Sequence, residues 1–182
     1  MSVHNYFLGK IIKRTGATLK GAKPGELINI SKIRVECLQW EEAKKIIPSI
    51  FREVRVVEIK EDNKKKQVLF YNLPTLDRVL KEKPVQRFLT VSGYPSPYSL
   101  EKYVEYLVNK MRWGRTYYEI GVFLGYPLKD VIGFMGYSPL KFTGIKGWRY
   151  YGDRALSEKI YARYQKAREE VRELLKEEGT FF

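Results

Sequence analysis

Two β-rich runs joined by a short charged segment constrain the fold of this chain more than any other feature of its sequence. The runs are EVRVVEIK and QVLFYN, and EDNKKK lies between them. An Asp-Asn pair among charged residues is typical of a solvent-exposed hairpin turn. The sequence therefore predicts an antiparallel hairpin over residues 53–72.

A third run, KIRVECLQW, has the alternation of a half-buried strand. Ile33, Val35 and Cys37 stand there between polar neighbours, so alternate side chains would face the core. Together with the hairpin, this run predicts a small, mainly antiparallel sheet.

Two helices are marked by a capping residue followed by apolar residues at helical spacing. Ser99 can cap a helix whose buried stripe runs from Leu100 to Met111. Asp153 can cap a longer closing helix, which Gly179 would end.

Shorter helical patterns precede these two. We expect a helix over Val3–Arg14 that Gly16 ends, and one over EEAKKII that Pro48 ends. A further helical pattern begins at Thr75, and Pro84 divides or kinks it. We therefore predict an α+β fold, a small mainly antiparallel sheet with several packed helices.

The stretch EIGVFLGYPLKDVIGFMGY has the pattern of two short helices that meet across a tight turn. Gly125 can take the left-handed conformation that the turn requires. We therefore predict a helix-turn-helix-like core element, in which four apolar side chains are buried: Ile120, Leu124, Val131 and Phe134.

This element is predicted to be structural and not to read DNA. Leu124 and Phe134 are expected to pack against Leu156 and Ile160 of the closing helix. A reading helix must turn polar or basic side chains towards bases or phosphates, and Lys129 is the one residue of the second helix that suits DNA.

The charge of the chain is strongly positive. Its 34 Lys and Arg against 21 Asp and Glu give a formal net charge of +13. Such a charge favours an anionic partner, namely nucleic acid, a phosphorylated ligand or an acidic surface. It equally fits a thermophile-like surface of Lys-Glu ion pairs. A length of 182 residues with 44% hydrophobic content predicts one domain over residues 1–182.

Composition also argues against some classes of protein. A single Cys, Cys37, excludes an internal disulfide framework, and with a single His, His4, no Cys/His metal site is expected. No apolar run reaches the length of a membrane span, and the amino terminus lacks the pattern of a signal peptide. We expect a cytoplasmic protein.

The first candidate site is the segment KRTGATLKGAKPGEL with the residues just before it. It contains no acid before Glu26, and its glycines let backbone amides approach an anion closely. It is therefore either a phosphate or nucleic-acid contact or a basic surface loop without a ligand. The candidate anion-binding residues are Lys10, Lys13, Arg14, Lys20 and Lys23.

Three stretches of the chain resemble the bacterial domain-of-unknown-function 3793 family. They are TLKGAKPGEL, YEIGVFLGYPLKDVIGF, and GWRYYGD followed by YARYQKARE, and they occur in the order found in that family. The resemblance implies a role in iron or redox physiology, because genes of the family often accompany flavodoxin and ferrous-iron transport genes. Tyr118 stands where the family usually has His, so a function that uses this His in relatives is not expected here.

The second candidate site is an aromatic pocket formed where the motifs of that resemblance would converge. Rings, a carboxylate and a guanidinium in one pocket suit a planar ligand or an unstacked base. Alternatively the rings pack as core, and Glu119 pairs with Arg149 or Arg115. The candidate pocket residues are Tyr117, Tyr118, Glu119, Tyr126, Trp148, Arg149 and Tyr150.

Two functions follow from these features. We expect a non-catalytic protein that binds an anionic partner, RNA or DNA without strong sequence preference. The alternative is an iron- or redox-linked accessory protein, or a small-molecule enzyme, with its pocket near Tyr118, Glu119 and Trp148. The spacing of residues indicates no catalytic group, and neither a cofactor nor an oligomeric state can be predicted.

Overall fold

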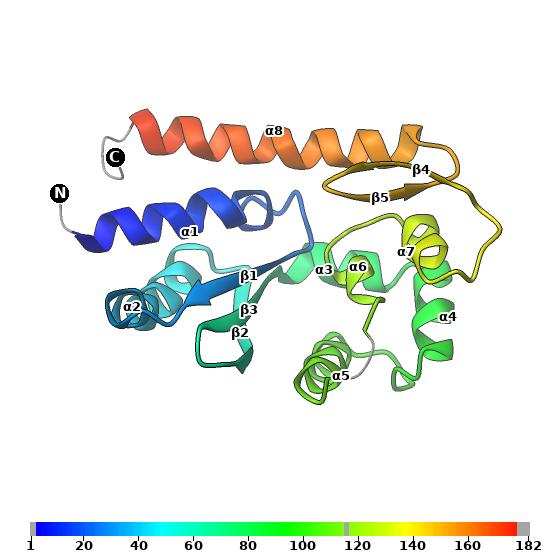
Figure 1. The fold of residues 1–182 in the computed structure, drawn as a ribbon, viewed down its shortest axis with the longest axis horizontal. Coiled ribbons are helices and arrows are strands. Elements are labelled where there is room, and N and C mark those ends of the chain that lie inside the picture. Colours follow the sequence, from blue (N-terminus) through cyan, green and yellow to red (C-terminus); the bar gives the residue numbers. More distant parts are fainter. Residues whose placement is uncertain (1–2, 115–116, 178–182) are drawn as a thin grey trace. The chain divides into compact units, whose positions relative to one another are not determined.

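The computed structural model describes residues 3–114 and 117–177. The chain divides into two compact units, one of Met1–Pro74 with Tyr164–Phe182 and one of Thr75–Arg163. The described residues form eight helices, a three-stranded antiparallel sheet and a two-stranded hairpin (Figure 1). The predicted α+β class is therefore confirmed.

The first unit is built on the three-stranded sheet. Its strands are β1 (Gly25–Ser31), β2 (Val54–Glu61) and β3 (Lys65–Asn72), in the order β1-β3-β2 and all antiparallel. The predicted hairpin is confirmed as β2 and β3. Helices α1 (Val3–Leu19) and α2 (Arg34–Ile50) both contact the sheet (Figure 1).

The prediction of a strand over KIRVECLQW was wrong, because α2 begins at Arg34 and continues to Ile50. Trp40, Ala43 and Ile47 of α2 are all buried, and this longer helical spacing outweighs the short alternation before it. Pro48 was predicted to end this helix, but it lies within the last turn of α2, which continues to Ile50. The third strand is GELINIS instead, where Ile28 and Ile30 alternate as buried residues.

Helix α1 does not stop at Gly16 as predicted but continues to Leu19. A Cβ atom at Gly16 would lie 3.1 Å from Cβ of Val171 in α8 (Ala155–Glu177). Glycine therefore serves at this position to let two helices approach closely, and not to end one of them.

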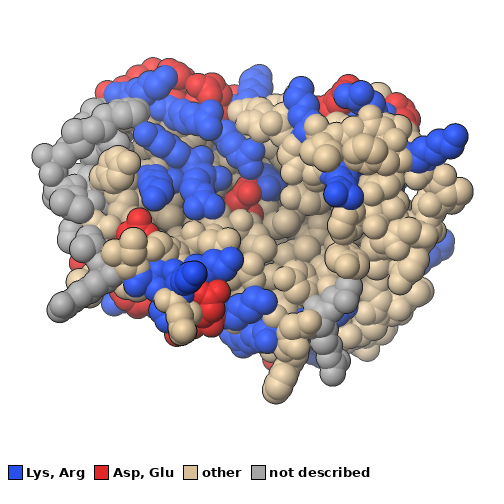
Figure 2. All heavy atoms as spheres, viewed as in Figure 1, with Lys and Arg blue, Asp and Glu red and all other residues tan. Residues whose placement is uncertain are grey.

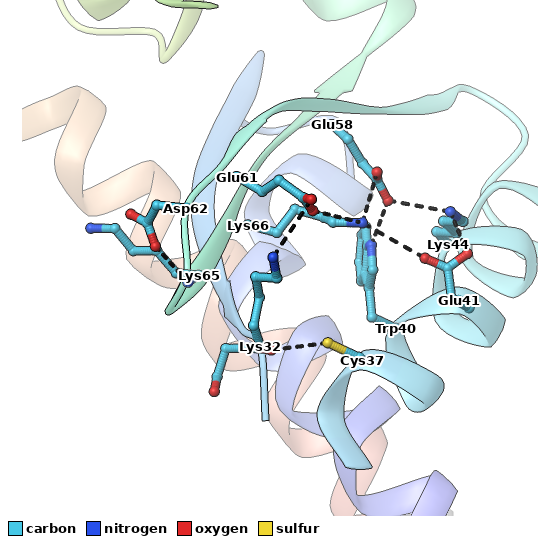
Figure 3. Close-up of polar contacts among 11 residues, drawn as sticks. Lys32, Cys37, Trp40, Glu41, Lys44, Glu58, Glu61, Asp62, Lys65 and Lys66 are labelled. Atoms are coloured by element: carbon cyan, nitrogen blue, oxygen red, sulfur yellow. Dashed lines mark hydrogen bonds and ion pairs between the residues drawn. The ribbon is translucent and has the colours of Figure 1, made fainter. Parts of the chain in front are cut away.

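Glu58 of β2 ties α2 to the sheet (Figure 3). It accepts hydrogen bonds from Trp40 Nε1 at 2.7 Å, Lys66 Nζ at 2.9 Å and Lys44 Nζ at 3.3 Å. Burial raises the pKa of this carboxyl group, but these three donors outweigh burial, so its pKa lies below the ordinary value. Its ionised form therefore stabilises the first unit, and this stabilisation is lost as the pH falls through the lowered pKa.

The second unit contains short helices and a hairpin. The helical pattern from Thr75 is divided as predicted: α3 (Leu73–Leu80) ends before Pro84, which lies in the first turn of α4 (Lys83–Val91). Ser99 accepts a hydrogen bond from the Lys102 amide at the start of α5 (Leu100–Arg112). The predicted buried stripe of α5, from Leu100 to Met111, is also confirmed. The unit also contains α6 (Ile120–Phe123), α7 (Leu128–Phe134), β4 (Phe142–Lys146) and β5 (Trp148–Tyr151).

Helix α8 follows the hairpin. Asp153 Oδ1 accepts a hydrogen bond from the Ala155 amide at 3.0 Å, so the predicted capping residue of the closing helix is confirmed. The predicted end at Gly179 lies outside the described residues.

The helix-turn-helix-like element is present as α6 and α7. Gly125 has φ of 76° between them, and Leu124 is buried, both as predicted. Phe134 and Leu156 were expected to be buried, but 46% and 48% of their surfaces are exposed. The reason is that α7 packs on the hairpin: a Cβ atom at Gly133 would lie 2.5 Å from Cγ of Tyr151 in β5.

Candidate functional site

Acidic side chains from distant parts of the sequence reach the predicted anion site in the first unit. Lys10 pairs with Glu36 at 3.6 Å, and Lys20 pairs with Glu170 of α8. The segment has no acidic residue before Glu26 in the sequence, but the fold brings Glu36 and Glu170 next to it. Three of the five predicted residues lie on α1 and two in the turn that follows: Lys10, Lys13 and Arg14, then Lys20 and Lys23.

Lys23 is a buried cation, with 4% of its side chain exposed. Its Nζ donates to Glu26 Oε2 at 2.7 Å and lies 5.7 Å from the centre of the Tyr164 ring. The same Glu26 oxygen accepts from Arg168 of α8 at 2.9 Å. Burial lowers the pKa of Lys23, although Glu26 opposes the shift. Lys23 therefore helps to hold α8 within the first unit, and it is not presented to a phosphate.

Lys and Arg side chains nevertheless gather over α1 and the carboxy-terminal part of α8, with Asp and Glu beside them (Figure 2). Within α8, Arg172 pairs with Glu169 and Lys176 pairs with Glu173, at 2.9 and 2.8 Å. This surface of the first unit thus carries several ion pairs. Such pairs fit the explanation of the net charge as a thermophile-like surface of paired Lys and Glu.

A cleft of about 480 Å³ opens in the second unit, among the residues before α6, the turn between α6 and α7, α7 itself and β5. Five of the seven predicted pocket residues line it: Tyr117, Tyr118, Tyr126, Trp148 and Arg149. Ile120, Gly121, Asp130, Val131 and Phe134 also line it.

Two stacked rings form the floor of the cleft. Tyr126 and Trp148 lie with ring centres 4.7 Å apart and planes 16° from parallel. A Cβ atom at Gly121 would lie 2.8 Å from Val131 and 3.1 Å from Tyr126, so only glycine allows α6 to approach this closely. The floor is therefore fixed by close packing of the turn.

Asp130 holds the Trp148 ring of this floor in place. Its Oδ2 accepts from Trp148 Nε1 at 2.8 Å and from Ser157 Oγ at 2.6 Å. Its Oδ1 accepts from Lys129 Nζ at 2.7 Å and from the Tyr151 amide at 2.9 Å. Two donors on each oxygen use the acceptor capacity of a carboxylate, so Asp130 positions α7, β5 and the start of α8.

Lys129 is engaged in the same network. Its Nζ also donates to the main-chain oxygen of Tyr151 at 2.8 Å and to Ser157 Oγ at 2.9 Å. The side chain that suited DNA in the sequence therefore binds internal acceptors, as expected for a structural element.

The rim of the cleft is aromatic and partly exposed. Tyr118 and Phe134 meet edge to face with ring centres 5.2 Å apart, and 51% and 46% of their surfaces are exposed. The Arg149 guanidinium lies 5.7 Å from the centre of the Phe134 ring. Tyr118 thus lies at the edge of the cleft.

Glu119 and Tyr150 do not line the cleft. Glu119 is 2% exposed, pairs with Lys110 and accepts from the Tyr94 hydroxyl at 3.3 Å. Burial, together with Glu119, raises the pKa of Tyr94. Tyr150 is fully buried, and its hydroxyl donates to the main-chain oxygen of Lys146 at 2.9 Å.

The expected alternative partners of Glu119 were Arg149 and Arg115. Arg149 lies at the rim of the cleft instead, and Arg115 lies outside the described residues. Sequence reasoning missed Lys110 as the partner and Asp130 as the centre of the floor. An Asp within an apolar helical stretch was the available signal for the second of these.

No group of three or more His, Cys, Asp or Glu side chains among the described residues could hold a metal ion. None of the described helices has both the length and the apolar content to cross a membrane.

Comparisons with known proteins give one match. No curated protein and no solved structure matches the chain. A family model described as a protein of unknown function, DUF3793, matches residues 11–181. Since this match covers nearly the whole sequence, the chain belongs to the DUF3793 family.

Proposed function

We propose that this protein binds a planar aromatic small molecule in the cleft of its second unit. The observation that carries the proposal is the cleft itself, about 480 Å³ in volume and walled by aromatic rings. Small-molecule sites in proteins are typically concave, largely apolar and about 300–1,000 Å³ in volume. The cleft has both the size and the chemistry of such a site.

The floor is ordered before any ligand arrives. The Trp148 ring is held by its hydrogen bond to Asp130 and by stacking on Tyr126. A ligand that stacks there would not need to order these side chains first, which lowers the entropic cost of binding.

The rim supports the same function. Tyr118 and Phe134 leave about half of their surfaces in water beside an apolar hollow. An exposed apolar patch around a concavity is a common mark of a binding site, because a ligand removes that surface from water. A planar ligand would cover both rings.

The test is a thermal-shift and tryptophan-fluorescence screen of the whole protein against flavins, haem, nucleotides and simple aromatic acids. We expect at least one of them to raise the melting temperature in proportion to its concentration. Phe134→Ala should lower the affinity for that ligand about tenfold, since ring stacking contributes roughly 1–3 kcal/mol to binding.

Phe142→Ala is the matched control, because Phe142 is similarly exposed on the hairpin but does not line the cleft. The proposal would be overturned if no compound raised the melting temperature, or if both variants lost the same affinity for the ligand.

A second candidate function is binding of RNA or DNA without strong sequence preference. The net charge of +13 and the Lys and Arg side chains over α1 and α8 favour it (Figure 2). The affinity for labelled RNA should fall steeply with salt, because counterion release drives such binding. A mobility-shift titration at low salt that shows no complex would rule this candidate out.

A further inference from the structure

Two charged side chains line the cleft in the described residues, Asp130 and Arg149. Their surroundings differ, and the difference decides which sign of ligand charge the cleft can hold. This step rests on the proposed function, because it concerns the ligand of the same cleft.

Asp130 has no capacity left for a ligand. Both of its oxygens accept two internal hydrogen bonds, and 1% of its side chain is exposed. A ligand cation would have to displace Lys129 or the Trp148 indole from the carboxylate, and it would thereby break the floor. A ligand cation would therefore meet ring faces alone, with no available carboxylate, and the positive charge of Arg149 at the rim would repel it.

Arg149 is in the opposite situation. It is exposed at the rim, and within the described part of the chain its guanidinium makes no hydrogen bond or ion pair. Its position near the Phe134 ring places a planar group of donors beside the place where a ligand ring would stack. A guanidinium presents paired N–H groups that match the two oxygens of a carboxylate or the oxygens of a phosphate.

We propose that the ligand of the cleft is an aromatic oxyanion, whose carboxylate or phosphate group binds Arg149 while its ring covers the floor. Arg149 is then the residue that selects an anion over a neutral or cationic molecule of the same shape. Carboxylate and phosphate share the chemistry that the guanidinium recognises, and the experiment separates them.

The experiment measures, by titration calorimetry at low salt, the affinity of the whole protein for four compounds with one naphthalene ring. They are 2-naphthoate, 2-naphthyl phosphate, the neutral 2-naphthamide and the cation 2-naphthylmethylammonium. We expect at least one of the anions to bind about tenfold more tightly than the amide, as for a charge-assisted hydrogen-bonded pair, and the cation to bind most weakly. The preferred anion identifies the source of the oxyanion.

Arg149→Gln should abolish the preference for the anion over the amide. Arg154→Gln is the control, because it removes the same charge from an exposed Arg of the second unit that pairs with Glu158 and does not line the cleft. It should keep the preference.

The outcomes separate the two proposals. Equal binding of anions and amide by the unmodified protein overturns the inference and leaves the proposed function standing. Tighter binding of the cation overturns the inference in favour of an aromatic cation site. Loss of the preference in Arg154→Gln as well overturns it by assigning the effect to net charge. Failure of all four compounds, together with an empty ligand screen, overturns both proposals.

Discussion

Replacing Asp130 with Asn is expected to lower the free energy of unfolding by about 3–5 kcal/mol, the usual cost of removing one partner from a buried charged network. The isosteric amide keeps one acceptor oxygen but turns the other oxygen into a donor. That donor would face two existing donors, either Trp148 and Ser157 or Lys129 and the Tyr151 amide. Urea denaturation followed by tryptophan fluorescence measures the loss.

Asp153→Asn is the matched control for this substitution. Asp153 is exposed and accepts one hydrogen bond from the Ala155 amide at the start of α8. Asn caps helices about as well as Asp, so the control should change stability by no more than a few tenths of a kcal/mol. Equal stabilities of the two variants would show that Asp130 does not hold the floor of the cleft.

The sequence predicted the local features of the fold well where a long pattern and a capping residue agreed. In α5, Ser99 and thirteen helical residues set one unambiguous face, and the structure buries that face. The short alternation around Val35 had no such support, because three residues fit either a strand or the first turn of a helix. The longer spacing through Trp40, Ala43 and Ile47 indicated the helix.

Contacts between distant residues explain what the sequence could not predict about charge. Lys20 appears in an acid-free segment, yet its partner Glu170 lies 150 positions further along the chain. Local composition carries no information about such a partner, so net charge alone does not indicate where an anion could bind. The same limit applies to Glu119, whose partner Lys110 lies on the preceding helix.

The ring residues of the cleft were easier to anticipate than its polar centre. Tyr117, Tyr118 and Tyr126 stand close in sequence on the two sides of α6, and Trp148 begins the strand β5 that packs on α7, so a compact fold brings these rings together. Asp130 was not among the residues predicted for the site. Its role depends on Ser157 and the Tyr151 amide, which reach it only once the hairpin has packed on α7.

Replacing Phe123 with Ala is expected to destabilise the protein by about 3–5 kcal/mol, the range for deleting a fully packed Phe side chain. Phe123 ends α6, is fully buried, and lies with its ring centre 5.8 Å from that of Tyr94. Its removal leaves a cavity that α6 cannot fill, because Gly121 already holds this helix against Val131 and Tyr126. Urea denaturation followed by far-UV circular dichroism measures the change.

Phe134→Ala is the comparison that makes this result specific to the helix-turn-helix-like element. Phe134 ends α7 but is 46% exposed at the rim of the cleft, so its removal should cost less than about 1 kcal/mol. The two variants thus divide the element into a packed first helix, on which stability depends, and a second helix whose last ring is available to a ligand. A larger loss of stability from Phe134→Ala than from Phe123→Ala would mean that α7 is buried as the sequence predicted, and that the cleft is closed in solution.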